Sequence, residues 1–140
     1  MINGTFEKVG KTAKNLYGPR GMLVGGFTPE DQEVLLGFLE SLQFKNLPVV
    51  FVSDTDNETL IKELISRPDR TGRGMESNLD RIIILSGITE NEFHQTLSTY
   101  RALGLLRPLW ATLTPTSETW RLSALIAELK KERSAMEKKQ

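Results

Sequence analysis

The stretch RIIILSGITENEF, residues 81–93, shows how the chain is built, because a strand signal ends in it and a helix signal begins at once. Four consecutive apolar residues at 82–85 predict a buried strand. Gly87 follows as a turn, and Thr89 with Glu92 three residues later has the spacing of a helix N-cap and its reciprocal partner. The stretch therefore predicts a strand, a tight turn and a capped helix.

Almost the same order of residues occurs earlier, in MLVGGFTPED at residues 22–31. Again an apolar strand leads to a glycine, one apolar residue and a threonine, which is followed by a proline and, three positions on, an acid. At an offset of 61 residues, Gly26 falls on Gly87 and Thr28 falls on Thr89. Two copies of one structural unit are therefore expected.

Each copy continues with a helix, a proline, a second apolar strand and a second helix. After one deletion, Pro48 falls on Pro108 and Leu60 falls on Trp120. We therefore predict a tandem βαβα repeat. In the first copy the predicted elements are a strand at 22–24, a helix at 30–43, a strand at 49–52 and a helix at 60–65. In the second copy they are a strand at 82–85, a helix at 90–103, a strand at 109–113 and a helix through 122–129.

The predicted fold class is α/β. Most of the strands are unbroken apolar runs, which indicates that helices cover both faces of the sheet. Right-handed crossovers within each half then give a four-stranded, mostly parallel sheet with the order 2-1-3-4. A ferredoxin-like α+β arrangement is the alternative, because it also contains two βαβ halves, but it buries only one face of its sheet.

Five segments follow from this pattern. Apolar residues at helical spacing between 3 and 17 predict an N-terminal helix, and the polar, aperiodic stretch after Ile65 predicts a solvated linker. The predicted boundaries are an N-terminal helix at 1–20, a first half at 21–65, a linker at 66–80, a second half at 81–132 and a charged tail at 133–140.

Composition narrows the function. The chain has 140 residues, no cysteine and one histidine, so disulfides and thiolate metal sites are excluded and a zinc site is disfavoured. No signal peptide and no apolar run of roughly 20 residues is present, so we expect a cytoplasmic protein with no membrane association. The net charge is zero, with an acidic first half and a basic second half that attract each other, so no nucleic-acid partner is expected.

The stretch LWATLTPTSETW at 109–120, with SGITENEFHQTLSTYR upstream, resembles an uncharacterised bacterial family, domain of unknown function number 3783. In that family a strand ends in Thr-Pro-Thr and a tryptophan opens the last helix, as Thr114, Pro115, Thr116 and Trp120 do here. The resemblance covers about residues 81–132 and implies no known activity. In the first half, Asp54-Thr55-Asp56 stands in place of Thr-Pro-Thr.

In the predicted strand order, both glycine turns flank the centre of the sheet, where open α/β sheets bind ligands. Free N–H groups at two helix starts would suit a small anion there. The competing interpretation is that each threonine caps its own helix and each glycine makes a turn. The candidate ligand-binding residues are Gly26, Thr28, Gly87 and Thr89, with Thr114, Thr116 and Ser117 on the same rim.

These features predict a non-catalytic regulatory module without a cofactor, whose partner is a small anionic ligand or another protein. One alternative is a metal-dependent phosphohydrolase that uses Asp54 and Asp56. The only histidine, His94, is predicted at the surface, where it would not act as a general base.

A further alternative is a self-associating protein, for which a homodimer is expected. It would use the broad apolar face of the first predicted helix, 30–43. Gly37 lies inside that helix, where a glycine costs about 1 kcal/mol of helix propensity relative to alanine. We therefore expect a neighbouring element to pack closely against Gly37.

Overall fold

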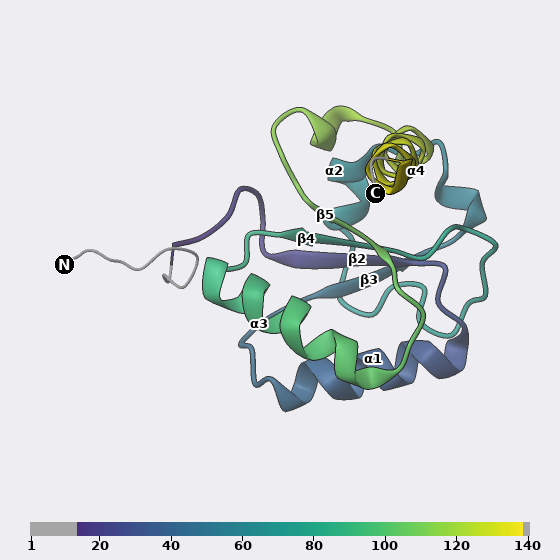
Figure 1. Ribbon diagram of the computed structural model, residues 1–140. Coiled ribbons are helices and arrows are strands. Elements are labelled where there is room, and N and C mark those ends of the chain that lie inside the picture. The colour runs from purple at the N-terminus through teal and green to yellow at the C-terminus, as the bar shows by residue number, and fades with distance from the viewer. Residues whose placement is uncertain (1–13, 139–140) are drawn as a thin grey trace.

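A four-stranded sheet lies between two layers of helices in the computed structural model, which describes residues 14–138 (Figure 1). Helices α1 and α3 cover one face, and α2 and α4 cover the other. The strands are β2 (Gly21–Gly25), β3 (Val49–Val52), β4 (Ile82–Ser86) and β5 (Leu109–Thr112). The helices are α1 (Pro29–Ser41), α2 (Ile61–Ile65), α3 (Glu90–Tyr100) and α4 (Leu122–Lys138), with short 3-10 turns η1 (Asp54–Asp56), η2 (Arg101–Leu103) and η3 (Ser117–Thr119).

The strand order is β3-β2-β4-β5, which confirms the predicted order 2-1-3-4. Within each half the strands are parallel, whereas the central pair β2 and β4 is antiparallel. The sheet is therefore mixed, and the expectation of a mostly parallel sheet was wrong. The strand order, and the helices on both faces, also exclude the ferredoxin-like alternative.

The reversal of the second half follows from the path of residues 66–80. This segment runs along the outer edge of β3 in the direction of that strand: Arg70 N–H donates to Val49 O (2.6 Å) and Phe51 N–H donates to Thr71 O (2.8 Å). The Asp69 carboxylate accepts from Val49 N–H (2.8 Å). The chain thus reaches the end of the sheet where β2 ends, and β4 starts there and runs back. The predicted solvated linker is instead a fixed cover of the β3 edge.

The two halves are related by an approximate twofold axis. Leu23 pairs with Ile84 at the centre, while Met22 pairs with Leu85 and Val24 pairs with Ile83, so positions 61 residues apart exchange places across the sheet. The starts of α2 and α4 show the same exchange, because Ile61 N–H donates to Trp120 O (2.9 Å) and Leu122 N–H donates to Thr59 O (3.0 Å).

The outer strands keep this offset as well. Val49 pairs with Met22, and Trp110 pairs with Ile83, so Val49 corresponds to Trp110 without any deletion. The predicted deletion, which aligned Pro48 with Pro108, was therefore wrong. The ladder hydrogen bonds fix the correspondence, and the two prolines take different places relative to their strands.

The core has two layers, as the unbroken apolar strands predicted. Side chains alternate between the faces along each strand. The layer toward α1 and α3 contains Met22, Val24, Val49, Phe51, Ile83 and Leu85. The layer toward α2 and α4 contains Leu23, Val50, Val52, Ile82, Ile84 and Leu109.

The described ends of the chain differ in part from the prediction. Residues 14–20 are extended and bent rather than helical, and Leu16 N–H donates to Ile88 O (2.7 Å) beside the start of α3. Residues 1–13 of the predicted N-terminal helix lie outside the described residues. The predicted charged tail continues α4 as far as Lys138. No helix among residues 14–138 is long and apolar enough to cross a membrane.

Candidate functional site

The two glycine turns lie at opposite ends of the sheet. Because β2 and β4 are antiparallel, Gly25 pairs with Ile82 at one end and Gly21 pairs with Ser86 at the other. Gly26 therefore follows β2 at one end, and Gly87 follows β4 at the far end. A single crevice that holds both turns is not formed. A ligand role for either turn on its own stays a prediction.

Close packing between the halves explains both glycines. Gly26 has φ +78°, and a Cβ added to it would lie 2.6 Å from Leu79 O and 2.7 Å from Arg81 Cα. Gly87 has φ +63°, and its Cβ would lie 2.6 Å from Arg20 N. Each turn is pressed against the backbone that leads into the other half's first strand, so a side chain does not fit at either position.

The predicted helix caps are present. Thr28 Oγ1 accepts from Asp31 N–H (3.1 Å) at the start of α1. Thr89 Oγ1 accepts from Glu92 N–H (3.0 Å), and the Glu92 carboxylate accepts in return from Thr89 N–H (2.9 Å). Both hydroxyls are therefore already bonded to their own helices.

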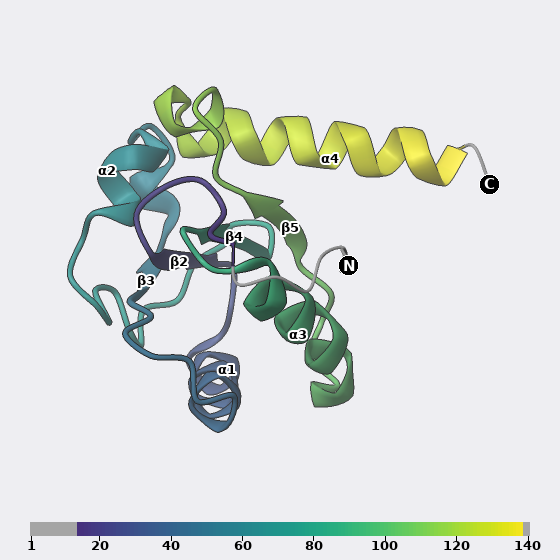
Figure 2. The same ribbon diagram turned by 90° about the vertical axis from the view of Figure 1, so that its left-hand side faces the viewer.

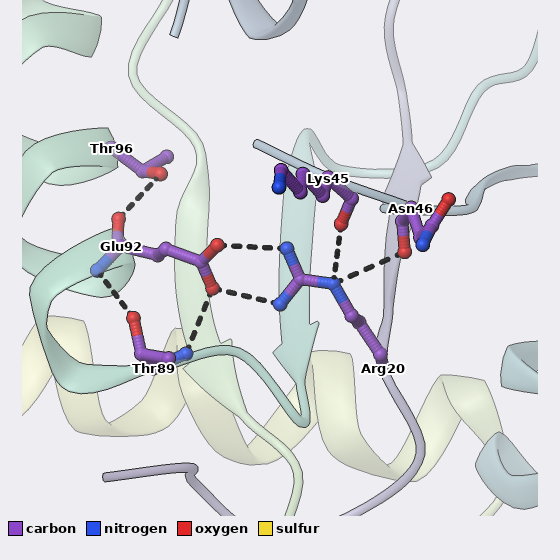
Figure 3. Close-up of polar contacts among 6 residues, drawn as sticks. All are labelled: Arg20, Lys45, Asn46, Thr89, Glu92 and Thr96. Carbon is purple, nitrogen blue, oxygen red and sulfur yellow. Dashed lines mark hydrogen bonds and ion pairs between the residues drawn. The ribbon is translucent and has the colours of Figure 1, made fainter. Parts of the chain in front are cut away.

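Each helix cap is completed by an arginine from the other half, which sequence reasoning missed. Arg20 donates two bonds to the Glu92 carboxylate, at 2.8 and 2.7 Å (Figure 3). Its Nε donates to the backbone carbonyl oxygens of Lys45 (2.8 Å) and Asn46 (3.1 Å). The guanidinium thus joins the start of α3 to the turn that leads into β3.

Arg81, which is 61 residues after Arg20, makes the equivalent contact in the other direction. Its Nη2 donates to the Asp31 carboxylate (2.9 Å), and its Cζ lies 4.1 Å from the centre of the Phe27 ring. The Arg81 side chain is only 8% exposed, and its Nη1 has no hydrogen-bond partner among the described residues. A signal was present in the sequence, since both arginines directly precede a first strand at the same offset.

The Arg20 contact makes one stabilising interaction dependent on pH. Hydrogen bonds from the Arg20 guanidinium, helped by Thr89 N–H, lower the pKa of Glu92, although burial opposes the shift. The ionised carboxylate therefore stabilises the fold above the unfolded-state pKa of about 4.3, and this stabilisation is lost as the pH falls through the lower folded-state pKa. We expect Glu92→Gln to lower the free energy of unfolding at pH 7, and the difference from wild type to shrink below about pH 4.

Urea unfolding of both proteins between pH 7 and pH 3 measures that difference. Glu63→Gln is the matched control, because Glu63 is exposed on α2. A difference between Glu92→Gln and wild type that stays constant over the whole range would contradict the assignment.

Asp54 and Asp56 are engaged in local structure. Asp56 accepts from Ser53 N–H (2.9 Å) and forms an ion pair with Arg67 (3.0 Å). Asp54 accepts from Asn78 N–H (2.8 Å). Within residues 14–138, no group of three or more His, Cys, Asp or Glu side chains is arranged to hold a metal ion.

The Thr-Pro-Thr loop forms a closed turn. Ser117 N–H donates to Thr114 Oγ1 (3.0 Å), and Thr114 N–H donates to Ser117 Oγ (3.1 Å). Thr119 donates to the carbonyl of Thr116 (2.9 Å). Because β5 is parallel to β4, this loop lies at the same end of the sheet as Gly87, away from Gly26.

The outer edge of β5 is open, unlike that of β3. Leu109 N–H and Leu113 N–H donate toward β4, to Arg81 O (2.8 Å) and Leu85 O (2.9 Å). By strand alternation, the peptide groups of Trp110 and Thr112 point outward. Among residues 14–138 these outward N–H and C=O groups have no hydrogen-bond partner.

Hollows flank this edge on both faces of the sheet. One, of about 600 Å³, lies on the α3 side and is lined by Leu97, Tyr100, Arg101, Leu105, Arg107 and Trp110. The other, of about 340 Å³, lies on the α4 side and includes Leu109, Leu129, Arg133 and Met136. Helix α4 extends past β5 and overhangs it (Figure 2). We call the edge of β5 and these two hollows the edge cleft.

The fold and this edge define an α/β protein with a mixed sheet that is closed on one side and open on the other. The model of a family described as a domain of unknown function (DUF3783) matches residues 81–136, from the start of β4 into the last turns of α4. This match confirms the predicted resemblance for that segment. No curated protein and no solved structure matches the chain significantly.

Proposed function

We propose that the chain is a non-catalytic protein-binding module, in which the edge cleft receives an extended segment of a partner protein. The observation that carries the proposal is the difference between the two edges of the sheet. Residues 69–71 satisfy the outer peptide groups of β3, whereas those of Trp110 and Thr112 are open. An exposed strand edge is a template for pairing with another chain.

The edge cleft has the two features that strand addition requires. The outward backbone groups supply hydrogen bonds, and pockets on alternate sides accept side chains of the added strand. The hollows on the α3 side and the α4 side of β5 stand in those positions, and Trp110 borders both of them. The partner's backbone would run beside Trp110 and Thr112, with its side chains pointing to the two hollows in turn.

The other functions considered from the sequence have less support. A small anion in a central crevice would need Gly26 and Gly87 in one place, but they lie at opposite ends of the sheet. A phosphohydrolase would need Asp54 and Asp56 to be available to a metal, but both carboxylates hold backbone groups or an arginine. Binding of another protein is the option that the open edge supports.

We also propose that the halves 21–65 and 81–132 are two copies of one βαβα unit, joined as a fused dimer. Support comes from contacts that recur with the partners exchanged at an offset of 61, including the pairs Arg20–Glu92 and Arg81–Asp31. A cytoplasmic location stays a prediction.

Thr112→Pro tests the binding proposal. Proline removes the outward N–H of Thr112, but no hydrogen bond to β4 depends on that group. Thr112→Val is the matched control, because valine keeps the N–H and the side-chain shape. Eight-residue peptides selected on the wild-type protein from a random displayed library serve as probes. We expect them to bind Thr112→Pro at least about tenfold more weakly than wild type, and Thr112→Val with unchanged affinity.

The position of the bound peptides is measured by NMR. The amide signals of Trp110 and Thr112 should shift and become protected from hydrogen exchange when a peptide binds. The proposal fails if the library yields no binder, if the shifts map away from β5, or if Thr112→Pro binds as well as wild type does.

A further inference from the structure

The arginines of the chain fall into two groups. Six of the nine arginines form ion pairs, namely Arg20, Arg67, Arg70, Arg73, Arg81 and Arg121. The remaining three, Arg101, Arg107 and Arg133, have no acidic partner among the described residues. All three line the edge cleft. The cations that the fold leaves uncompensated are therefore gathered beside the open strand.

The α3-side hollow has the character of a carboxylate site. Arg101 and Arg107 are both exposed side chains in its lining, and the described residues that line it include no acid. Tyr100 and Trp110 form an aromatic wall, with ring centres 5.2 Å apart and planes at 88°. The Tyr100 hydroxyl is already used, because it donates to Leu106 O (2.9 Å). The free donors at this hollow are thus two guanidinium groups, which match a carboxylate in geometry and charge.

We propose that this hollow recognises aspartate or glutamate side chains of the bound segment, so that the partner is an acidic extended peptide. The inference rests on the proposed function, since it needs a strand beside β5. In such a strand, every second side chain points to the same face of the sheet. Acidic residues at alternate positions would then face Arg101 and Arg107.

The α4-side hollow sets the character of the intervening positions. Its lining combines the apolar side chains of Leu109, Leu129 and Met136 with Arg133 and two glutamates. The apolar side chains favour apolar residues at the intervening positions of the partner, and the mixed charges give no preference for an acid there. The expected partner sequence therefore alternates acidic and apolar residues.

Charge argues against a second copy of this chain as the occupant. Antiparallel pairing of two β5 edges about a twofold axis would place Arg101 and Arg107 of both copies around the same junction. Like charges that face each other oppose such pairing. An acidic segment would instead neutralise these arginines.

Three acetylated and amidated eight-residue peptides test the preference: valine alternating with glutamate, with glutamine, or with lysine. Titration calorimetry and the NMR shifts of Trp110 and Thr112 measure binding to the full chain. We expect the glutamate peptide to bind wild type at least about tenfold more tightly than the glutamine peptide, with a preference that weakens in high salt. Arg107→Glu should remove this preference and favour the lysine peptide.

Lys62→Glu is the control for net charge, because Lys62 is an exposed cation on α2, and it should bind as wild type does. Equal binding of the three peptides, or library binders without acidic residues, overturns the acidic preference and leaves the strand-binding function standing. Failure of every peptide, library binders included, to bind at the edge overturns both. A dimer of the free chain in light scattering that Thr112→Pro dissociates would assign the edge to a second copy, and overturns the acidic partner.

Discussion

Gly26→Ala is expected to destabilise the protein by about 3 kcal/mol or more. Alanine at φ +78° costs about 1 kcal/mol in backbone conformation alone. The larger part is steric, because the new Cβ would lie 2.6 Å from Leu79 O and 2.7 Å from both Asp80 C and Arg81 Cα. All three are backbone atoms, so they can move only if the entry to β4 moves away from the end of β2.

Gly37→Ala is the matched control for this substitution. Gly37 is exposed in α1, and nothing lies within 4 Å of the position of an added Cβ. The expected close neighbour of Gly37 is therefore absent from the described structure, and that expectation was wrong. Alanine should stabilise the protein by about 0.5–1 kcal/mol through its helix propensity. Urea unfolding of the two variants measures both effects, and equal changes in stability would contradict the packing of Gly26 against the second half.

Asp31→Asn is expected to destabilise the protein by about 3 kcal/mol, because it removes the only acidic partner of a buried cation. The Arg81 side chain is 8% exposed, and its ion pair with Asp31 spans 2.9 Å. Asparagine keeps the shape of the side chain but leaves the guanidinium charge uncompensated. The same substitution also removes a negative charge from the first turn of α1, which adds a few tenths of a kcal/mol.

Glu33→Gln provides the comparison, because Glu33 pairs with Arg73 at 2.7 Å but both side chains are about half exposed. An ion pair in that environment contributes about 0.5 kcal/mol or less. Thermal unfolding of both variants in low and high salt separates the two cases. A loss of stability no larger for Asp31→Asn than for Glu33→Gln would show that Arg81 does not need its partner.

Local signals in the sequence predicted the elements and the helix caps of this fold. Thr28 and Thr89 cap α1 and α3 as their spacing indicated, because a cap depends on residues within one turn. The apolar runs predicted the two-layered core for a similar reason, since strand burial is written in consecutive residues.

The direction of the second half depended on contacts that leave no local pattern. It follows from the path of residues 66–80, and in particular from the bonds of Asp69 and Arg70 to Val49. A polar segment without periodicity reads as a solvated linker, although its backbone here completes the edge of a sheet. The error then passed to the candidate site, because a central crevice requires the two halves to run in the same direction.

The edge cleft was not predicted for the same reason. Arg101 and Arg107 are ordinary charged residues in the sequence, and only the list of ion pairs in the folded chain shows that they lack acidic partners among the described residues. Arg20 and Arg81, in contrast, could have been found, because they stand at equivalent positions before β2 and β4.

The cover over β3 sets a limit on how far assembly at the sheet can proceed. A sheet with two open edges can add a strand on each side and so grow without end into a fibre. In this chain residues 69–71 already occupy one side, so addition at β5 is a terminal event. Complexes formed there have a fixed stoichiometry of one added strand per chain.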